Sequence, residues 1–307
     1  MIRLGVAARV LGRPMPIMGG PHLSVALLGL REIFSYLAGI GAGAFRLPDT
    51  LLPRDLAAAR VELAESADML AELGAQARQA RLRLSVHPGL HVALATDDNE
   101  LAARASATLT LHAELLDALG CNRDGVIVVH VGAAGGAGQA ALERFAVRYE
   151  RLPRYVRERV AVEADQSCFD LAALVWLRRW SGVPLIFDSL HFQLHNPTCM
   201  PISEALSLAL SSWPAGVRPK IHVSTQRTEA HLQPGRRGGA PVVLAPRRGQ
   251  HADYLNPFEF VALLRAAAGL GDFDVMIEAK AADLALLRLR DDLHLYAPDL
   301  AEQVLDA

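Results

Sequence analysis

The stretch that decides the fold is residues 183–191, which read Val-Pro-Leu-Ile-Phe-Asp-Ser-Leu-His. Its apolar core, residues 185–187, follows a Gly-x-Pro breaker and is typical of a strand buried on both faces of a parallel sheet. Asp188 stands where that strand should end, and His191 follows three residues later in the expected loop. Because an unpaired carboxylate out of water is costly, we expect both side chains to share a partner there.

The same arrangement, an apolar run closed by a histidine or an acid, recurs at residues 126–130, 160–163, 220–222 and 275–278. Periodicity and breakers predict eight alternations of strand and helix. The expected strands are 2–7, 44–47, 82–86, 126–131, 160–163, 185–187, 220–224 and 274–278. The expected helices are 24–37, 55–79, 99–119, 139–149, 169–180, 202–210, 257–268 and a segment from 283 onward, with 226–250 irregular.

This alternation has no break in composition, which favours an α/β fold made of one closed barrel, a single (β/α)8 TIM barrel domain over residues 1–307. An open, doubly wound sheet is the alternative. The barrel is preferred because acids and imidazoles end so many strands, and a closed barrel brings all eight carboxyl ends around one mouth.

The bulk composition describes a soluble globular protein, with 51% hydrophobic and 21% charged residues. A formal net charge of -2 gives no global basic excess, although a local patch would suffice for nucleic acid. Three cysteines without CxxC spacing argue against a disulfide framework and favour a reducing cytoplasm. We expect no signal peptide and no membrane span.

The residues that end the strands predict a metal centre. Imidazoles and carboxylates in this number can hold two or three divalent ions, and clustered ions suit phosphate ester cleavage because they activate water and neutralise phosphate charge. Taken singly, a histidine after a strand is more often a hydrogen-bonded loop residue, and a strand-end acid is often a helix cap. Independent caps would rarely produce the whole set, which is His87, His130, Glu163, Asp188, His191, His222, His251 and Glu278.

Other features leave their alternatives open. The Gly/Ala-rich loop at 132–138 could cradle a phosphate, although a small-residue turn is the preferred interpretation. A basic segment precedes His251; it suits a phosphodiester backbone, and it equally suits a solvated loop. Its arginines are Arg227, Arg236, Arg237, Arg247 and Arg248. Most of the remaining histidines are expected at the surface; they are His22, His91, His112, His195, His231 and His294.

Seven motifs in this order resemble the UV damage endonuclease family, and all the matches together are spread from about residue 40 to residue 280. They are Ser85-Val-His-Pro-Gly89, Val128-Val-His-Val-Gly132, Ala161-Val-Glu-Ala-Asp165, Phe187-Asp-Ser-Leu-His191, Pro219-Lys-Ile-His-Val-Ser224, Gln250-His-Ala-Asp-Tyr254 and Asp274-Val-Met-Ile-Glu-Ala-Lys280. The resemblance implies an endonuclease IV-like barrel with metal ions, commonly manganese, at its mouth. It also implies a nick immediately 5′ of a DNA lesion, which leaves a 3′-hydroxyl.

By this resemblance the eight strand-end residues match the family's metal ligands. Glu163 would bridge two ions; Asp188, His222 and Glu278 would complete one site, His87 and His130 another, and His191 with His251 a third. Glu163, Lys220 and Glu278 are the candidate catalytic residues, and Lys220 matches a lysine that can be carboxylated beside the metals. Asp253 falls in the family's His-x-Asp pattern, and Arg46, in Phe45-Arg-Leu, matches an arginine beside the active site.

Two departures bear on lesion recognition. The family's His-Pro-Gly continues with Gln-Tyr, whose side chains wedge into the duplex, whereas this chain has Leu90 and His91. Leu90 can act as an apolar wedge but cannot hydrogen-bond an unpaired base. After the first strand, where the family has Tyr and Asn, Val6 and its neighbours are apolar or basic.

The leading hypothesis is therefore a metal-dependent endonuclease of DNA excision repair. It would act on damaged double-stranded DNA with manganese, or with Zn²⁺ or Co²⁺ as alternatives, without a membrane or an obligate protein partner. The expected DNA contacts are Arg46, Leu90, His91, Arg247 and Arg248. The alternatives are a sugar isomerase of the xylose isomerase type, an abasic-site endonuclease of the endonuclease IV type, and a non-catalytic binder of damaged DNA.

Overall fold

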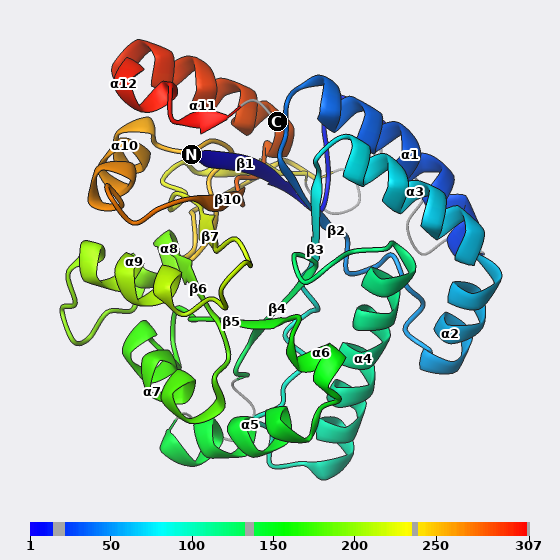
Figure 1. Cartoon of the computed structure of the whole chain (residues 1–307). Helices are drawn as coiled ribbons and strands as arrows, with labels where there is room; N and C mark the ends of the chain where they lie inside the picture. Colours follow the sequence, from blue (N-terminus) through cyan, green and yellow to red (C-terminus); the bar gives the residue numbers. More distant parts are fainter. Residues whose placement is uncertain (15–21, 133–137, 235–238, 306–307) are drawn as a thin grey trace.

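The computed structural model describes residues 1–14, 22–132, 138–234 and 239–305 and shows a closed parallel barrel with helices around it (Figure 1). Its strands are β1 Ile2–Ala7, β2 Ala44–Leu47, β3 Arg83–Val86, β4 Val126–His130, β5 Val160–Glu163, β6 Leu185–Asp188, β7 Lys220–Val223 and β10 Phe273–Ile277. Each strand pairs in parallel with the next along the barrel, and β10 pairs with β1 to close it. The expected single (β/α)8 TIM barrel is confirmed.

The helices pack outside the barrel, so both faces of each strand are covered (Figure 1). Several begin at an acid or amide that caps the free backbone N–H groups; Asp98, for example, accepts from the N–H groups of Glu100 and Leu101. The helices are α1 Leu23–Gly39, α2 Leu56–Glu65, α3 Ala67–Gln79, α4 Asn99–Ala118, α5 Gln139–Arg151, α6 Arg154–Arg157, α7 Leu171–Ser181, α8 Ser189–Leu194, α9 Ile202–Ser211, α10 Pro257–Ala266, α11 Ala282–Tyr296 and α12 Pro298–Ala301.

The one long helix expected over residues 55–79 is wrong, because it is broken at Ser66 into α2 and α3. Ser66 has φ −99° and ψ 11°, outside the helical range, and is buried. The break lets α2 pack on α4 while α3 packs mainly on α1. Helical periodicity continues on both sides of Ser66, so the pattern alone does not reveal the change of direction.

A buried ion cluster joins the strands at the end of the barrel where they begin. Asp274 on β10 is fully buried and accepts from Arg3 of β1 at 2.7 and 2.8 Å, from Arg83 of β3 at 2.7 Å and from Arg218 at 2.8 Å. Three guanidinium groups therefore converge on one carboxylate, which links the strands that close the barrel.

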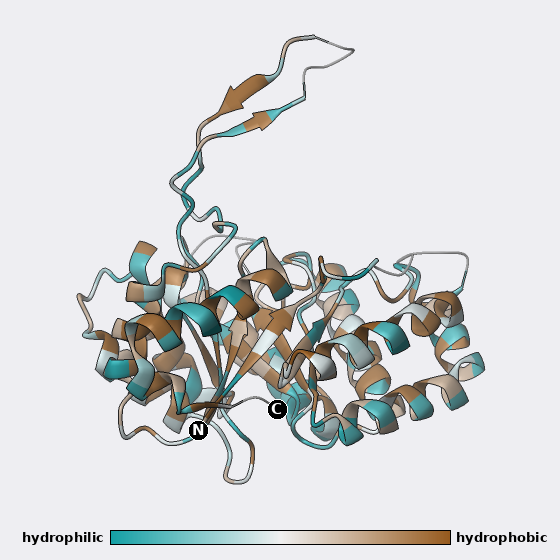
Figure 2. Cartoon of the chain, turned by 90° about the horizontal axis from the view of Figure 1, so that it is seen from above, coloured by the Kyte–Doolittle hydropathy of each residue, from teal (hydrophilic) through white to brown (hydrophobic). Residues whose placement is uncertain are grey.

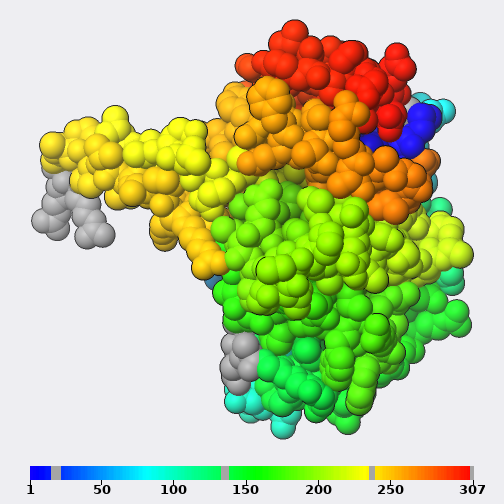
Figure 3. Space-filling model, turned by 90° about the vertical axis from the view of Figure 1, so that its left-hand side faces the viewer, coloured from blue at the N-terminus to red at the C-terminus, as the bar shows by residue number. Residues whose placement is uncertain are grey.

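The segment expected to be irregular, residues 226–250, contains an antiparallel hairpin instead. Its strands are β8 His231–Gln233 and β9 Val242–Leu244, which pair only with each other among the described residues. The hairpin projects well clear of the barrel, from the end where the barrel strands finish (Figures 2 and 3). The signal in the sequence is a pair of short runs on either side of a Gly/Pro-rich stretch.

The two described ends of the chain meet at the opposite end of the barrel, where β11 Val304–Leu305 pairs in parallel with the start of β1. Among the described residues, none of the helices combines the length and the apolar character needed to cross a bilayer. The division of residues 1–307 into one domain stays a prediction.

Candidate metal centre

Neighbouring strands bring the candidate ligands to one end of the barrel. The register sets His130 of β4 beside Glu163 of β5, and Asp188 of β6 beside His222 of β7. Glu278 follows directly after β10, the strand that pairs with β7. Residues far apart in sequence therefore meet at the mouth, as the strand-end pattern predicts.

Glu163 lies at the centre of this group. Its Oε2 is 2.9 Å from Nε2 of His87 and 3.7 Å from Nε2 of His130. Its Oε1 is 3.1 Å from Nδ1 of His222 and 3.5 Å from Nδ1 of His191. One buried carboxylate thus contacts four imidazoles through both oxygens, which is the placement a bridging ligand needs.

A second group consists of Asp188, His222 and Glu278, all able to offer ligand atoms to one point. Nδ1 of His222 is 3.2 Å from Oε1 of Glu278. Two buried atoms here, Oδ2 of Asp188 and Nε2 of His222, have no hydrogen-bond partner among the described residues. Because buried polar atoms are normally paired, the unpaired Oδ2 of Asp188 fits a cation as its missing partner.

His191 and His251 lie at the edge of the cluster. His191 is in the first turn of α8, not in a loop as expected, because Oδ1 of Asp188 accepts its backbone N–H at 2.7 Å and caps that helix. Nδ1 of His251 is 2.7 Å from the carbonyl oxygen of Glu278 and 3.9 Å from its Oε2. Nδ1 of His191 is 2.9 Å from the carbonyl oxygen of Ala164, so both rings are held by backbone oxygens while facing a carboxylate.

The electrostatics favour cation binding. Burial would raise the pKa of Glu163, but the imidazoles of His222 and His130 hold it well below its usual range. For Glu278, burial is outweighed by Arg46 and then His222, which lower the pKa to about 2. Burial also lowers the pKa values of His130 and His251. Divalent metals bind ionised carboxylates and neutral imidazoles. His191 differs from His130 and His251, because Asp188 and Glu163 raise its pKa against the effect of burial, so its ring would release a proton when a metal binds.

Asp188 behaves differently. Burial raises its pKa to about 7, partly opposed by His191 and reinforced by the neighbouring Glu163 and Glu278 carboxylates. Three acids crowd into the same buried space, and within the described chain the nearby compensating groups are Arg46 and the imidazoles. This excess of negative charge is what clustered divalent ions would neutralise.

Six of the eight expected ligands fall into three groups whose ligand atoms lie within 4.8 Å of one another. His130 and His251 stand outside these groups, although each faces a cluster carboxylate at 3.7 or 3.9 Å. The three groups are His87 with Glu163 and His222, Glu163 with Asp188 and His191, and Asp188 with His222 and Glu278.

The other residues singled out in the sequence occupy distinct places. Arg46 on β2 donates to Oε1 of Glu278, directly beside the cluster. Lys220 is fully buried on β7, and its Nζ lacks a hydrogen-bond partner among the described residues. Burial, with Arg83 next in importance, places its pKa well below the usual range. Asp253 pairs with Arg227 through contacts of 3.0 and 3.2 Å.

Four of the five expected DNA contacts are exposed, whereas Arg46 is half-buried beside the cluster. Leu90, in the loop after β3, has 75% of its surface accessible, and His91 beside it is also exposed. Arg247 and Arg248 lie at the base of the hairpin, where Arg248 donates to the carbonyl oxygen of Leu194. These placements leave Leu90, His91 and Arg247 free to meet a large ligand at the mouth.

Some of the residues singled out in the sequence lie outside the described part of the chain, and His112 is buried instead of lying at the surface. The Gly/Ala-rich loop at 132–138 falls largely on residues 133–137, and Arg236 and Arg237 fall within 235–238; both lie outside the described residues. His112, expected with the surface histidines, is buried on α4, with Nδ1 3.1 Å from the carbonyl oxygen of Thr108. Burial lowers its pKa to about 4.

Sequence reasoning also missed Gln226. Its side-chain amide donates to the carbonyl oxygen of Arg247 at 2.9 Å, and its Oε1 accepts from the N–H of Gly249 at 2.8 Å. Gln226 therefore closes the base of the hairpin next to His251, with which it forms an isolated bridge. No periodic pattern identifies a lone amide of this kind; only the expectation of a hairpin would have drawn attention to it.

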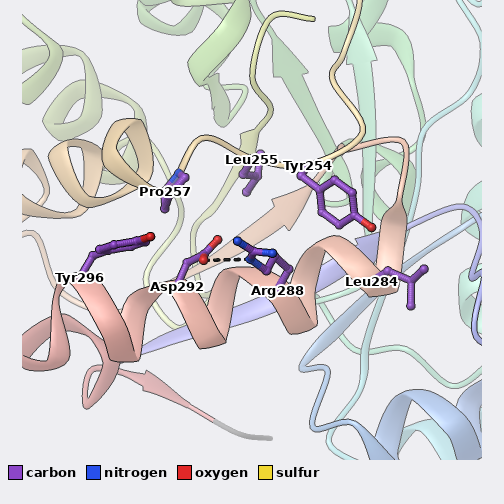
Figure 4. A pocket seen from close by; sticks show the side chains of 7 residues that line it. All are labelled: Tyr254, Leu255, Pro257, Leu284, Arg288, Asp292 and Tyr296. Atoms are coloured by element: carbon purple, nitrogen blue, oxygen red, sulfur yellow. Dashed lines mark hydrogen bonds and ion pairs between the residues drawn. The ribbon is translucent and has the colours of Figure 1, made fainter. Parts of the chain in front are cut away.

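A separate cavity of about 350 Å³ lies beside α11 (Figure 4). Its lining includes Tyr254, Leu284 and Tyr296, and Arg288 donates to Asp292 within it at 2.9 Å. None of the candidate ligands lines it. The cavity is therefore separate from the cluster of candidate metal ligands.

The sequence matches the family model described as UV-endonuclease UvdE over residues 24–302. A UV DNA damage endonuclease from Bacillus velezensis is 29% identical over 271 residues, which cover 84% of this chain and 77% of that protein. Another from Bacillus cereus is 29% identical over 225 residues, which cover 72% of this chain and 65% of the relative, just under two thirds of its length.

Solved structures share the fold. SacUVDE superposes with a TM-score of 0.78 at 24% identity, covering 96% of this chain and 99% of that one. Endonuclease IV from Thermus thermophilus gives a TM-score of 0.58 at 16% identity, covering 95% and 99%. D-psicose 3-epimerase from Clostridium cellulolyticum gives 0.59 at 13% identity, covering 99% and 100%. At these identities the structural likeness speaks for the barrel alone.

Proposed function

This chain belongs to the UV-endonuclease UvdE family, and from that premise we propose that it is a metal-dependent DNA repair endonuclease. It would hydrolyse one phosphodiester on the 5′ side of a UV photoproduct or another lesion in double-stranded DNA. The observation that carries the metal dependence is Glu163, whose two carboxylate oxygens contact imidazoles from four different parts of the barrel mouth.

The residues present fit a cluster of two or three divalent ions. The buried atom Oδ2 of Asp188 is without a hydrogen-bond partner among the described residues, and the donor set mixes imidazole with carboxylate. Glu163 would bridge; Asp188, His222 and Glu278 would hold one ion. His87 and His130 would hold a second, and His191 with His251 a third. Manganese is the metal we propose, with Zn²⁺ and Co²⁺ as alternatives that this donor set also accepts.

When bound, such ions polarise the phosphoryl group and make water nucleophilic at neutral pH. The chain's own residues arrange that chemistry. Arg46 keeps Glu278 ionised and offers a guanidinium beside the cluster, which suits a phosphodiester oxygen. Lys220, buried and held towards its neutral form, is in the state that carboxylation of its amine requires. Leu90 and His91 would meet the lesion.

The proposed cytoplasmic location rests on chemistry as well. The three cysteines Cys121, Cys168 and Cys199 are all free, as is normal in a reducing compartment. Fractionation of cells that express the tagged full-length chain tests this location. Recovery of the protein outside the cytoplasm would contradict it.

The deciding experiment is a nicking assay with a lesion panel. Manganese-loaded protein is incubated with UV-irradiated, abasic-site and undamaged duplexes of one sequence, and the 5′ and 3′ ends of the products are mapped. We expect a nick 5′ of the photoproduct that leaves a 3′-hydroxyl, and no nick in Asp188→Asn protein. Asp97→Asn, an exposed acid with no hydrogen bond or ion pair described, is the control and should cleave normally.

The panel also separates the alternatives. Cleavage of the abasic duplex alone would keep the chemistry and assign a substrate of the endonuclease IV type. Tight binding of damaged DNA without cleavage would indicate a non-catalytic binder. No action on any duplex by metal-loaded protein would remove the endonuclease claim, and the sugar isomerase alternative would then be tested with ketose substrates.

A further inference from the structure

The hairpin of β8 and β9 has no packing partner in the described chain. Its register pairs Leu232 with Val243, and the exposed fractions of these side chains are 68% and 67%. Val242 is likewise more than half exposed. An isolated two-stranded hairpin is only marginally stable in water. Because the apolar side chains of this hairpin are exposed, we expect a binding partner to cover them.

Hydrogen bonds and an ion pair hold the base of the hairpin beside the candidate metal ligands. Gln226 holds the two limbs together, and Arg227 reaches across to Asp253 through two contacts. His251 directly follows the second limb and is tied to Glu278. A molecule bound to the hairpin would therefore lie at a defined position relative to the cluster of candidate metal ligands.

The net positive charge of residues 226–250 favours a negatively charged partner. Residues 226–250 contain five arginines and one glutamate, although the whole chain has a net charge of -2. Positive charge is thus concentrated in this segment of the sequence, and two of its arginines, Arg247 and Arg248, lie exposed at the base of the hairpin, which complements a polyanion.

The hairpin is poorly suited to adding a strand from another protein chain. Each of its strands has only three residues. Pro234 follows β8 directly, and Pro241 precedes β9. Proline lacks the N–H needed to extend a ladder and blunts strand edges. The edge of the hairpin is therefore protected, and its faces remain as the contact surface.

We propose that this hairpin is a DNA-binding arm that lies along a groove of the duplex on one side of the cleaved phosphodiester. The inference rests on the proposed function and adds how the substrate is held. A two-stranded ribbon fits the major groove of B-DNA, and apolar side chains such as Leu232 and Val243 can pack against base methyl groups and sugars. Residues 228–234 of one limb reach about 20 Å, which is about six base pairs of duplex.

The test compares the full-length protein with a variant in which residues 229–245 are replaced by Gly-Ser-Gly, leaving Gln226, Arg227 and Arg247 in place. Metal content and circular dichroism confirm that the barrel is intact. Binding is measured on a damaged duplex with long flanks and on two duplexes shortened by six base pairs on one flank or the other. We expect the full-length protein to lose about 10-fold in affinity when one particular flank is shortened, and the variant to show no such loss.

Salt dependence gives a second readout that does not require excision of the hairpin. Arg236→Ser with Arg237→Ser should weaken binding to the long duplex and reduce the slope of log affinity against log salt by about 2. The matched control is Arg81→Asn with Arg123→Ser, which removes two exposed arginines from loops at the opposite end of the barrel. The control should keep both the affinity and the slope.

The outcomes are separable. Equal affinities of parent and excised variant for every duplex would overturn the arm while leaving the endonuclease intact. A dimeric parent that becomes monomeric on excision, with DNA binding unchanged, would assign the hairpin to a second copy of the chain and also overturn it. Flank-dependent binding without any nicking would support the arm and count against the proposed activity alone.

Discussion

At the scale of single residues, Glu163 should decide whether metal is held at all. Glu163→Gln keeps the side-chain volume but removes the charge, and its NH₂ group cannot act as a ligand. Because losing even an outer contact of a metal ligand costs about 10–100-fold in affinity, we expect at least a 100-fold loss of metal affinity and a comparable loss of nicking. Metal analysis after equilibrium dialysis measures this directly.

Glu302→Gln, an exposed acid at the far end of the barrel, is the matched control. It should retain its metal and its activity. A Glu163→Gln protein that keeps the full metal complement would show that this carboxylate is not a bridging ligand.

The buried His112 makes a prediction about pH. Its pKa in the folded protein is lowered to about 4 by burial, against about 6.5 in the unfolded chain. Its neutral form therefore stabilises the fold above pH 6.5, and that contribution is lost as the pH falls towards 4, by about 3 kcal/mol in total. His112→Gln should lose less stability than the parent over this range in urea denaturation at stepped pH, with metal removed from both. Parallel pH curves would show that His112 does not titrate in this way.

At the scale of elements, capping of α4 offers a clean test of local structure. Asp98 accepts from the N–H groups of Glu100 and Leu101 at 2.8 and 3.1 Å, at the start of a long helix. Asp98→Ala should lower the free energy of unfolding by about 1 kcal/mol. The neighbouring Asp97→Ala should change it by less than about 0.5 kcal/mol, as is usual for exposed sites. Equal urea midpoints for the two variants would contradict the capping role.

The elements also show what a sequence can and cannot give. The strands were predictable because most are short apolar runs with a polar residue at or just after their end. Parallel pairing then forces those ends together, and Glu163 and His222 meet for that reason. The break at Ser66 was not predictable, because it depends on which helices α2 and α3 pack against. The hairpin was missed because a Gly/Pro-rich segment of modest apolarity resembles a loop.

The candidate site also has features that the sequence predicts and features that it does not. The eight candidate ligand positions follow from strand ends, but their distances do not: His130 and His251 lie 3.7 and 3.9 Å from a cluster carboxylate, whereas His87 lies at 2.9 Å. The cap from Asp188 that turns His191 into α8 depends on one hydrogen bond. Gln226 has no sequence signature, because its role depends on hydrogen bonds to residues of the other limb of the hairpin.

At the scale of the whole molecule, closure of the barrel depends on Asp274. This buried carboxylate accepts from Arg3, Arg83 and Arg218, so it joins the first and last barrel strands to β3 and to the loop before β7. Removing one partner of a buried ion cluster leaves uncompensated charge and costs about 3–5 kcal/mol. Asp274→Asn should therefore lower the free energy of unfolding by about that amount. Asp272→Asn, an exposed neighbour that contacts the terminal amine and Arg218, should cost about 0–1 kcal/mol.

The number of steps in the urea-unfolding transition tests whether the chain forms a single domain. If residues 1–307 form one domain, circular dichroism and tryptophan fluorescence should report the same urea midpoint, and Asp274→Asn should move both together. Trp213 packs beside Arg83 near the ion cluster, whereas Trp176 and Trp180 stack on the outer helix α7, so fluorescence reports from both regions. Two separated transitions, with only one of them shifted by Asp274→Asn, would contradict a single domain and would confine the role of the ion cluster to part of the barrel.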